Sequence, residues 1–119
     1  MEITKVERIN SIIIAAYNEF IEKGYEQTSM NNIAERANLS KGGLYHHFTS
    51  KEELLFAVNS YIMQPIASLM RKTELNDSPF LGLKQFISGY FNFWIEHKKD
   101  LEINLIVISK LIQSNDGRN

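Results

Sequence analysis

The segment from Ser40 to Leu55, SKGGLYHHFTSKEELL, concentrates side chains that can donate hydrogen bonds to phosphate oxygens or to the edge of a base. The donors are Lys41, Tyr45, His46, His47 and Lys51. Between positions 36 and 51 the chain has three cationic residues, two histidines and no acid, although its net charge is −1. The nearly neutral total therefore hides a local positive face, which suits a polyanion such as nucleic acid.

Two adjacent glycines, Gly42 and Gly43, lie beside Lys41 at the start of a predicted short helix. Each costs about 1 kcal/mol of helix stability relative to alanine. Without side chains they let the backbone approach a base edge or a phosphate closely. Their pairing with Lys41 favours a helix that reads a DNA groove.

The segments around these residues are predicted to be helices, so the predicted fold class is all-α. Apolar residues at steps of three and four predict a first helix and an inward stripe: Val6, Ile9, Ile13, Ala16 and Phe20. A second, short helix begins at Thr28 or Ser29, and a third runs from its cap Ser40 to about Phe48. Asn38 tolerates the left-handed backbone of a tight turn between them. A longer helix followed by two short ones predicts a helix-turn-helix unit in residues 1–50.

Residues 51–119 are predicted to form a second helical region. Ser50 and Glu53 have the spacing of a capping box, which starts a linking helix at 51–73 that Pro65 kinks. After a linker at 76–78, Ser78 caps a helix at about 79–97 with Pro79 at its first position. The two lysines at 98–99 form a solvated turn before a last helix at 100–114, and the remaining residues form a frayed tail.

The block TSMNNIAERANLSKGGLYHHFTSKEELL, preceded by a helix that ends in phenylalanine and then Gly-Tyr, closely resembles the TetR family of bacterial transcriptional regulators. The resemblance covers roughly residues 9–58. Its matching positions are Phe20, Gly24, Tyr25, Thr28, Ile33, Ala34, Leu39, Ser40, Gly43, Leu44, Tyr45, Phe48, Lys51 and Leu54. It implies a homodimeric repressor in the bacterial cytoplasm that binds a palindromic double-stranded operator and responds to a small-molecule inducer.

The resemblance also implies roles for individual residues. At the start of the second helix, Thr28 and Ser29 would contact phosphate. The major groove would face Lys41, Gly42 and Gly43, with Tyr45 and His46 on bases or backbone and His47 and Lys51 on phosphate.

Family members usually continue through about nine helices, and the last two form the dimer interface. Residues 51–119 are therefore expected to be an incomplete regulatory and dimerisation region. The alternative is a truncated regulator that pairs with another chain and does not bind DNA itself.

Aromatic residues gather on the predicted helix at 79–97: Phe86, Tyr90, Phe93 and Trp94. The resemblance suggests that they line a ligand pocket. Aromatics at helical spacing are more often ordinary core, and a face that meets another chain is a third possibility.

Other functions find little support in the sequence. Adjacent helical side chains point about 100° apart, so His46 and His47 make a poor metal site, and no cofactor is expected. The chain has no cysteine, which fits a reducing cytoplasm. No secretory signal or membrane-length apolar run is present, and no nucleophile motif or phosphate loop indicates an enzyme. The alternative to a DNA-binding helix-turn-helix is one that serves only the structure of the protein.

Overall fold

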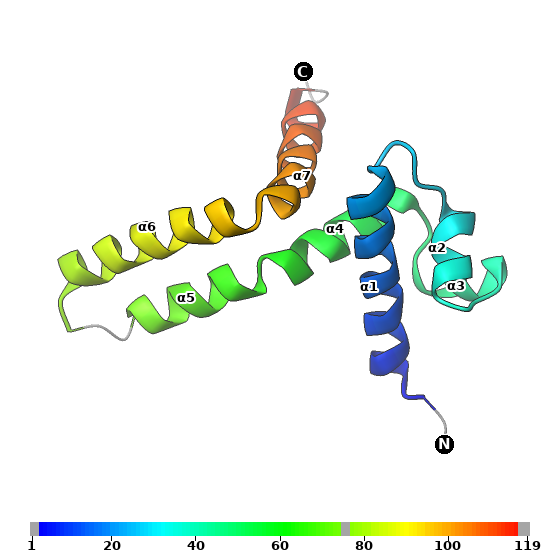
Figure 1. The fold of residues 1–119 in the computed structure, drawn as a ribbon, viewed down its shortest axis with the longest axis horizontal. Helices are drawn as coiled ribbons and strands as arrows, with labels where there is room; N and C mark the ends of the chain where they lie inside the picture. Colours follow the sequence, from blue (N-terminus) through cyan, green and yellow to red (C-terminus); the bar gives the residue numbers. More distant parts are fainter. Residues whose placement is uncertain (1–2, 75–76, 117–119) are drawn as a thin grey trace.

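The computed structural model describes residues 3–74 and 77–116, and within these ranges every regular element is an α-helix (Figure 1). The helices are α1 Lys5–Lys23, α2 Met30–Arg36, α3 Lys41–His47, α4 Lys51–Ile62, α5 Gln64–Glu74, α6 Pro79–Glu96 and α7 Lys98–Asp116. The all-α prediction is confirmed. Position 76 of the predicted linker and positions 117–119 of the predicted tail lie outside the described residues.

The first helix buries a face that differs slightly from the predicted stripe. Ile12, Ala16 and Phe20 are buried, whereas Val6, predicted to face inward, is 67% exposed. The helix begins at a capping box between Thr4 and Glu7, so Val6 lies in its exposed first turn.

The turn between α2 and α3 has the predicted geometry. Asn38 adopts a φ of 59°, which confirms the expected left-handed backbone. Ser29 and Ser40 cap the two helices through their side-chain oxygens, which accept hydrogen bonds from the amides of Asn32 and Gly43. The turn thus fixes the angle at which α3 leaves α2.

The predicted linking helix at 51–73 is in fact two helices, α4 and α5, with a break at Met63. Pro65 has no N–H to donate to the carbonyl of Tyr61, and the amide of Met63 turns back to the carbonyls of Asn59 and Tyr61. The proline therefore ends the first helix instead of only kinking one long helix.

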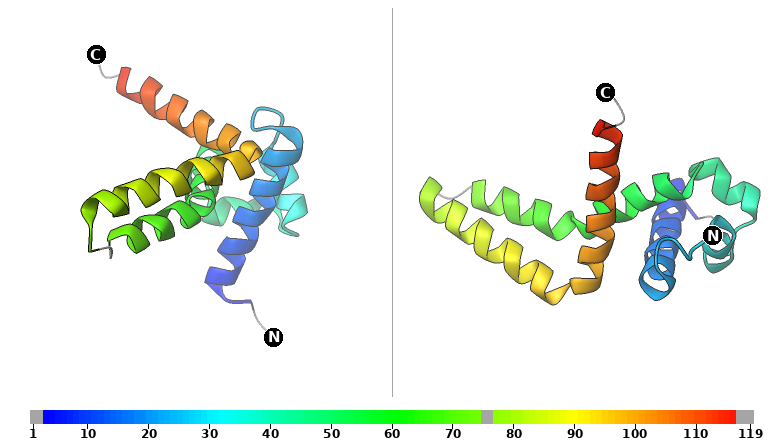
Figure 2. Two further views of the ribbon diagram at one scale, coloured as in Figure 1. Left: turned by 60° about the vertical axis from the view of Figure 1, so that its left-hand side comes forward. Right: turned by 90° about the horizontal axis from the view of Figure 1, so that it is seen from above.

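The second half of the chain folds as a hairpin and a returning helix. α5 and α6 run antiparallel and project away from α1–α3, while α7 packs back against α4 and α1 (Figure 2). The predicted solvated turn at 98–99 is wrong, because both lysines lie in the first turn of α7. His97 alone forms the junction, and its amide donates to the carbonyl of Phe93.

One core joins the two halves. It includes Leu44 of α3, Leu54 and Val58 of α4, and Ile103 and Val107 of α7. Helices α3 and α7 are thus packed, through α4, into the same buried cluster. No helix among the described residues is long and apolar enough to cross a membrane.

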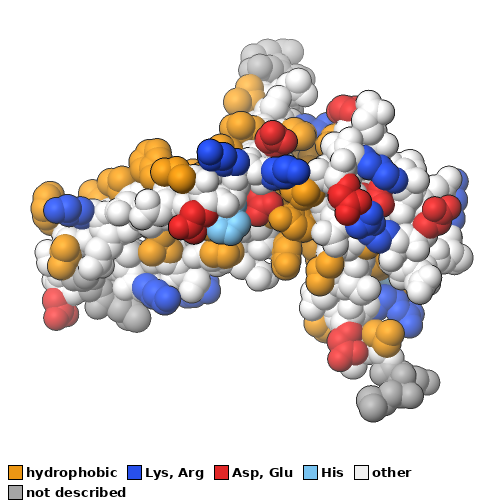
Figure 3. Space-filling view, in the orientation of Figure 1, with side chains coloured by type: hydrophobic (Ala, Val, Ile, Leu, Met, Phe, Trp, Pro, Cys, Tyr) orange, Lys and Arg blue, Asp and Glu red, His pale blue; other side chains and the backbone are white. Residues whose placement is uncertain are grey.

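A large apolar surface remains uncovered on α6 and α7. It consists of ten side chains that are 44–79% exposed: Phe80, Leu81, Leu83, Ile87, Phe91, Ile95, Leu105, Ile108, Leu111 and Ile112. Figure 3 shows hydrophobic side chains along the upper edge of α6 and up α7. We call these ten residues the α6–α7 apolar face.

Candidate nucleic-acid interface and ligand cavity

The start of α3 presents its backbone openly. Lys41, the first residue of α3, is exposed, and a Cβ on Gly42 would meet no atom within 4 Å. Gly43 is tighter, since a Cβ there would lie 3.2 Å from the Oγ of Ser40. Gly42 therefore gives a bare, accessible stretch of helix beside a lysine, whereas Gly43 also serves the local packing at the helix cap.

The rest of α3 divides into an anchored face and a donor face. Leu44 is fully buried and Phe48 is 8% exposed, as predicted for core residues. Tyr45 and His46 are exposed, and the Nζ of Lys41 lies 6.0 Å from the centre of the Tyr45 ring. The buried residues hold α3 so that Lys41, Tyr45 and His46 point into solvent.

His47 stands in a cationic neighbourhood that extends onto α1. Partial burial lowers the pKa of His47, and the charges of His46, Arg8 and Lys5 lower it further. Sequence reasoning missed Lys5 and Arg8; their spacing of three at the start of an amphipathic helix places them on one face. The positive face is therefore wider than the segment from 36 to 51.

Arg36, by contrast, adds little to that positive face. Its Nε donates to Glu19 at 2.8 Å, and its other nitrogens bond both carboxylate oxygens of Glu22. These bonds join α2 to α1, so the role of Arg36 is to position α2. The sequence of residues 36–51 does not reveal this pairing, because both glutamates lie in α1.

Lys51 links the positive segment to the turn after α1. Its Nζ donates to the carbonyl oxygen of Tyr25 at 2.8 Å and lies 4.2 Å from the centre of the Tyr25 ring. An ammonium carries three donors, so two remain for another acceptor. The predicted capping box is present in part: the amide of Glu53 donates to the Oγ of Ser50 at 3.1 Å, whereas the Glu53 carboxylate accepts from the amide and hydroxyl of Thr49.

Thr28 does not fit its predicted role. Its side chain is 3% exposed, and its hydroxyl donates to the carbonyl of Gly24 at 2.8 Å. A phosphate could not reach that hydroxyl, so Thr28 instead fixes the turn between α1 and α2. Ser29 is exposed and caps α2, which leaves it accessible.

The four aromatic residues predicted for a ligand pocket do not surround one cavity. Phe86 faces a shallow groove beside Met70, whereas Phe93 lines a separate, larger cavity. Tyr90 is half-buried against Trp94, which is itself 7% exposed. The indole N–H of Trp94 has no hydrogen-bond acceptor among the described residues.

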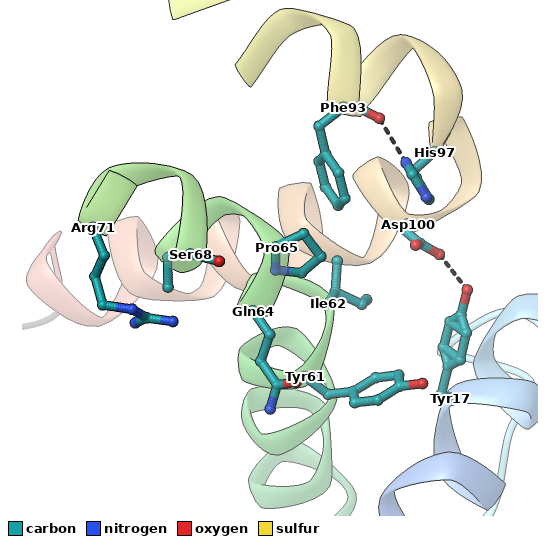
Figure 4. Close-up of a pocket in the computed structure, with 11 residues that line it drawn as sticks. Tyr17, Tyr61, Ile62, Gln64, Pro65, Ser68, Arg71, Phe93, His97 and Asp100 are labelled. Carbon is teal, nitrogen blue, oxygen red and sulfur yellow. Dashed lines mark hydrogen bonds between the residues drawn. The ribbon is translucent and has the colours of Figure 1, made fainter. Parts of the chain in front are cut away.

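The larger cavity, of about 770 Å³, lies where α4 breaks into α5. Its lining comes from five helices: Tyr17, Tyr61, Ile62, Gln64, Pro65, Ala67, Ser68, Arg71, Phe93, His97 and Asp100 (Figure 4). The hydroxyl of Tyr17 donates to Asp100 at 2.6 Å, and burial together with that carboxylate raises the pKa of Tyr17 to about 12. Sequence reasoning did not find this cavity, because its residues are scattered from position 17 to position 100.

In the described parts of the chain, no three histidine, aspartate or glutamate side chains lie close enough to hold a metal ion.

A short helix anchored by buried residues, with exposed donors and a bare glycine at its start, defines the unit of residues 5–48 as a helix-turn-helix of the DNA-binding type.

The comparisons with known proteins agree with this class. Residues 12–58 match the family model described as bacterial regulatory proteins, tetR family. Over 92 residues the chain is 34% identical to the HTH-type transcriptional activator FasR of Mycolicibacterium smegmatis, a match that covers 76% of this chain and 42% of that protein. The chain belongs to the TetR family, as its sequence pattern predicted.

Solved structures support the same assignment. The TetR family transcriptional regulator PfmR from Thermus thermophilus is 32% identical, with a TM-score of 0.63 over 79% of this chain and 52% of that one. A TetR-like transcriptional regulator from Rhodococcus sp. RHA1 gives a TM-score of 0.72 over 97% of this chain and 67% of that one; at 24% identity it shows the shared fold alone. The chain spans less than half the length of the curated relatives it matches.

Proposed function

We propose that this protein is a sequence-specific regulator of transcription that binds double-stranded DNA through α3, and is not an enzyme. The observation that carries the proposal is the pairing of exposed Lys41 with the open backbone at Gly42, on a helix held in place by buried Leu44. Lys41 can donate to a guanine edge, and Ser29, Tyr45, His46, His47 and Lys51 are the proposed contacts to bases or phosphate. Operator binding would place the protein in the cytoplasm of a bacterium, where the chromosome lies.

The test is selection of bound duplexes from a random library by the purified chain. We expect enrichment of one site, and Lys41→Ala should then weaken binding to that site by about 1–3 kcal/mol without changing affinity for unrelated duplexes. Lys72→Ala, an exposed lysine on α5, is the control. Absence of enrichment would refute sequence-specific binding by the chain alone.

We further propose that the regulator acts as a homodimer on a palindromic operator, with its two α3 helices about 34 Å apart in successive major grooves. The α6–α7 apolar face supports this proposal. Its ten side chains, each 44–79% exposed, are large apolar groups of the kind that mark protein–protein contacts when they gather on a surface. An apolar hollow of about 370 Å³ between Phe80 and Ile87 gives the face a place for a partner side chain.

Sedimentation equilibrium tests the dimer. We expect a dimer for the wild type and a monomer for Phe91→Glu, because a charge in an apolar interface is costly. A wild-type monomer that binds no duplex would favour the second candidate, a module that pairs with another chain through the same uncovered face and does not bind DNA itself.

Repression in response to a small molecule is the regulatory mode that we propose. Occupancy of an operator can by itself exclude polymerase, which makes repression the simpler outcome. A ligand in the cavity at the α4–α5 break would change the angle between α4 and α5, and thereby the spacing of the two α3 helices. A reporter gene behind the selected site tests the sign, and activation by the protein would refute repression.

A further inference from the structure

The cavity at the α4–α5 break has the size and construction of a small-molecule site. Its volume of about 770 Å³ lies within the range of roughly 300–1,000 Å³ that is usual for such sites. It touches α1 through Tyr17, α5 through Arg71 and α7 through Asp100. A molecule bound there would contact both the helix-turn-helix unit and the helices behind it.

The Arg71 side of the cavity favours an anion. The neutral hydroxyl of Tyr17 does not balance the charge of Asp100, but that carboxylate lies on the other side of Pro65 from Arg71 (Figure 4). Arg71 forms no ion pair with any described residue, so its guanidinium is available to a ligand. His97 has its Nδ1 2.8 Å from the carbonyl oxygen of Phe93, which leaves Nε2 available to a ligand. A guanidinium binds a carboxylate through two parallel hydrogen bonds, a geometry that a simple point charge does not provide.

The walls of the cavity favour a flat, aromatic body. The rings of Tyr17 and Tyr61 meet edge to face with their centres 5.7 Å apart. At the end of α6, the ring of Phe93 stacks on the ring of His97 with their centres 4.3 Å apart. Figure 4 shows Arg71 on one side of Pro65 and the Tyr17–Asp100 pair on the other.

We propose that this cavity binds a planar aromatic carboxylate, with the carboxylate on Arg71 and the ring against the aromatic side chains of the lining. The regulatory meaning of this site rests on the proposed function, because a ligand there would act on DNA binding through Tyr17. The binding itself does not depend on DNA.

The experiment is isothermal titration calorimetry of the full chain without DNA, with 2-naphthoate as the probe. We expect 2-naphthoate to bind, and Arg71→Gln to weaken it at least tenfold. Lys72→Gln, which changes the neighbouring exposed lysine outside the cavity, should leave the affinity unchanged. Arg71 is exposed, so its replacement should not unfold the chain, and thermal melting followed by circular dichroism checks this.

Two further probes separate the charge from the ring. The cation 2-naphthylmethylammonium should not bind, and decanoate, an aliphatic anion, should bind at least tenfold more weakly than 2-naphthoate. No binding of 2-naphthoate, equal binding by Arg71→Gln, or equal binding of either control probe would overturn the proposal. A chain that binds 2-naphthoate but ignores DNA would instead refute the proposed function and leave the site assignment intact.

Discussion

Tyr17 and Asp100 lie 83 positions apart in the sequence, yet the hydroxyl of Tyr17 donates a hydrogen bond of 2.6 Å to the Asp100 carboxylate. The bond joins α1 of the helix-turn-helix unit to the first turn of α7. A second polar contact ties α7 to the rest of the molecule, because the side-chain amide of Asn104 donates to Asn59 of α4 at 3.0 Å.

This bond should make the stability of the protein sensitive to alkaline pH. The pKa of Tyr17 is raised from 10 to about 12, so its contribution to folding is complete below pH 10 and is lost as the pH rises from 10 to 12. We expect the urea midpoint of the wild type to fall more steeply over this range than that of Tyr17→Phe. Equal slopes for the two proteins would contradict the assignment.

Replacing Gly42 should change the stability of the fold and the affinity for DNA in opposite directions. Its Cβ position is empty, so Gly42→Ala should stabilise α3 by up to about 1 kcal/mol while it weakens binding to the selected duplex. Gly43→Ala is the comparison, because its Cβ would press on the Ser40 Oγ at 3.2 Å and should offset that gain. Thermal melting and fluorescence anisotropy measure the two quantities. Unchanged DNA affinity in Gly42→Ala would show that the backbone there does not approach DNA.

Lys51 should contribute to both stability and general affinity. Lys51→Ala removes the hydrogen bond to the Tyr25 carbonyl and should lower the free energy of unfolding by about 1 kcal/mol. If its remaining donors bind phosphate, affinity for all duplexes falls and the salt slope decreases by about 1. Titrations at several salt concentrations, with Lys72→Ala as control, measure the slope. An effect confined to one duplex sequence would argue for a base contact instead.

His47 should couple DNA binding to pH. Its pKa is lowered from 6.5, so the side chain is mainly neutral at pH 7, and a phosphate nearby would favour its protonated form. Affinity for DNA should therefore rise as the pH falls through 6.5 and below, and His47→Asn should flatten this dependence. Without DNA, the lowered pKa of His47 should make the free energy of unfolding decrease as the pH falls. The reason is that the unfolded chain takes up the proton more readily than the folded protein does. Identical pH profiles for wild type and variant would exclude a phosphate contact by His47.

The local structure could be predicted from the sequence because its causes lie within a few residues. Ser40 caps the helix that follows it, Asn38 takes the left-handed turn, and Leu44 and Phe48 recur at the spacing of one helix face. These interactions depend on neighbours three or four positions away, so the helix-turn-helix unit and its exposed donors follow from the order of the residues.

The burial and pairing of other side chains depend on residues from other helices. The burial of the Thr28 hydroxyl, the bonds from Arg36 to Glu19 and Glu22, and the hydrogen bond between Tyr17 and Asp100 all need two helices to meet. Periodicity shows which face of a helix is apolar but does not show which other helix covers it. The order of the residues is therefore enough to predict the all-α class and the short helix with its exposed donors. Packing between segments that are distant in the chain determines which charged side chains stay unpaired and where the cavity lies.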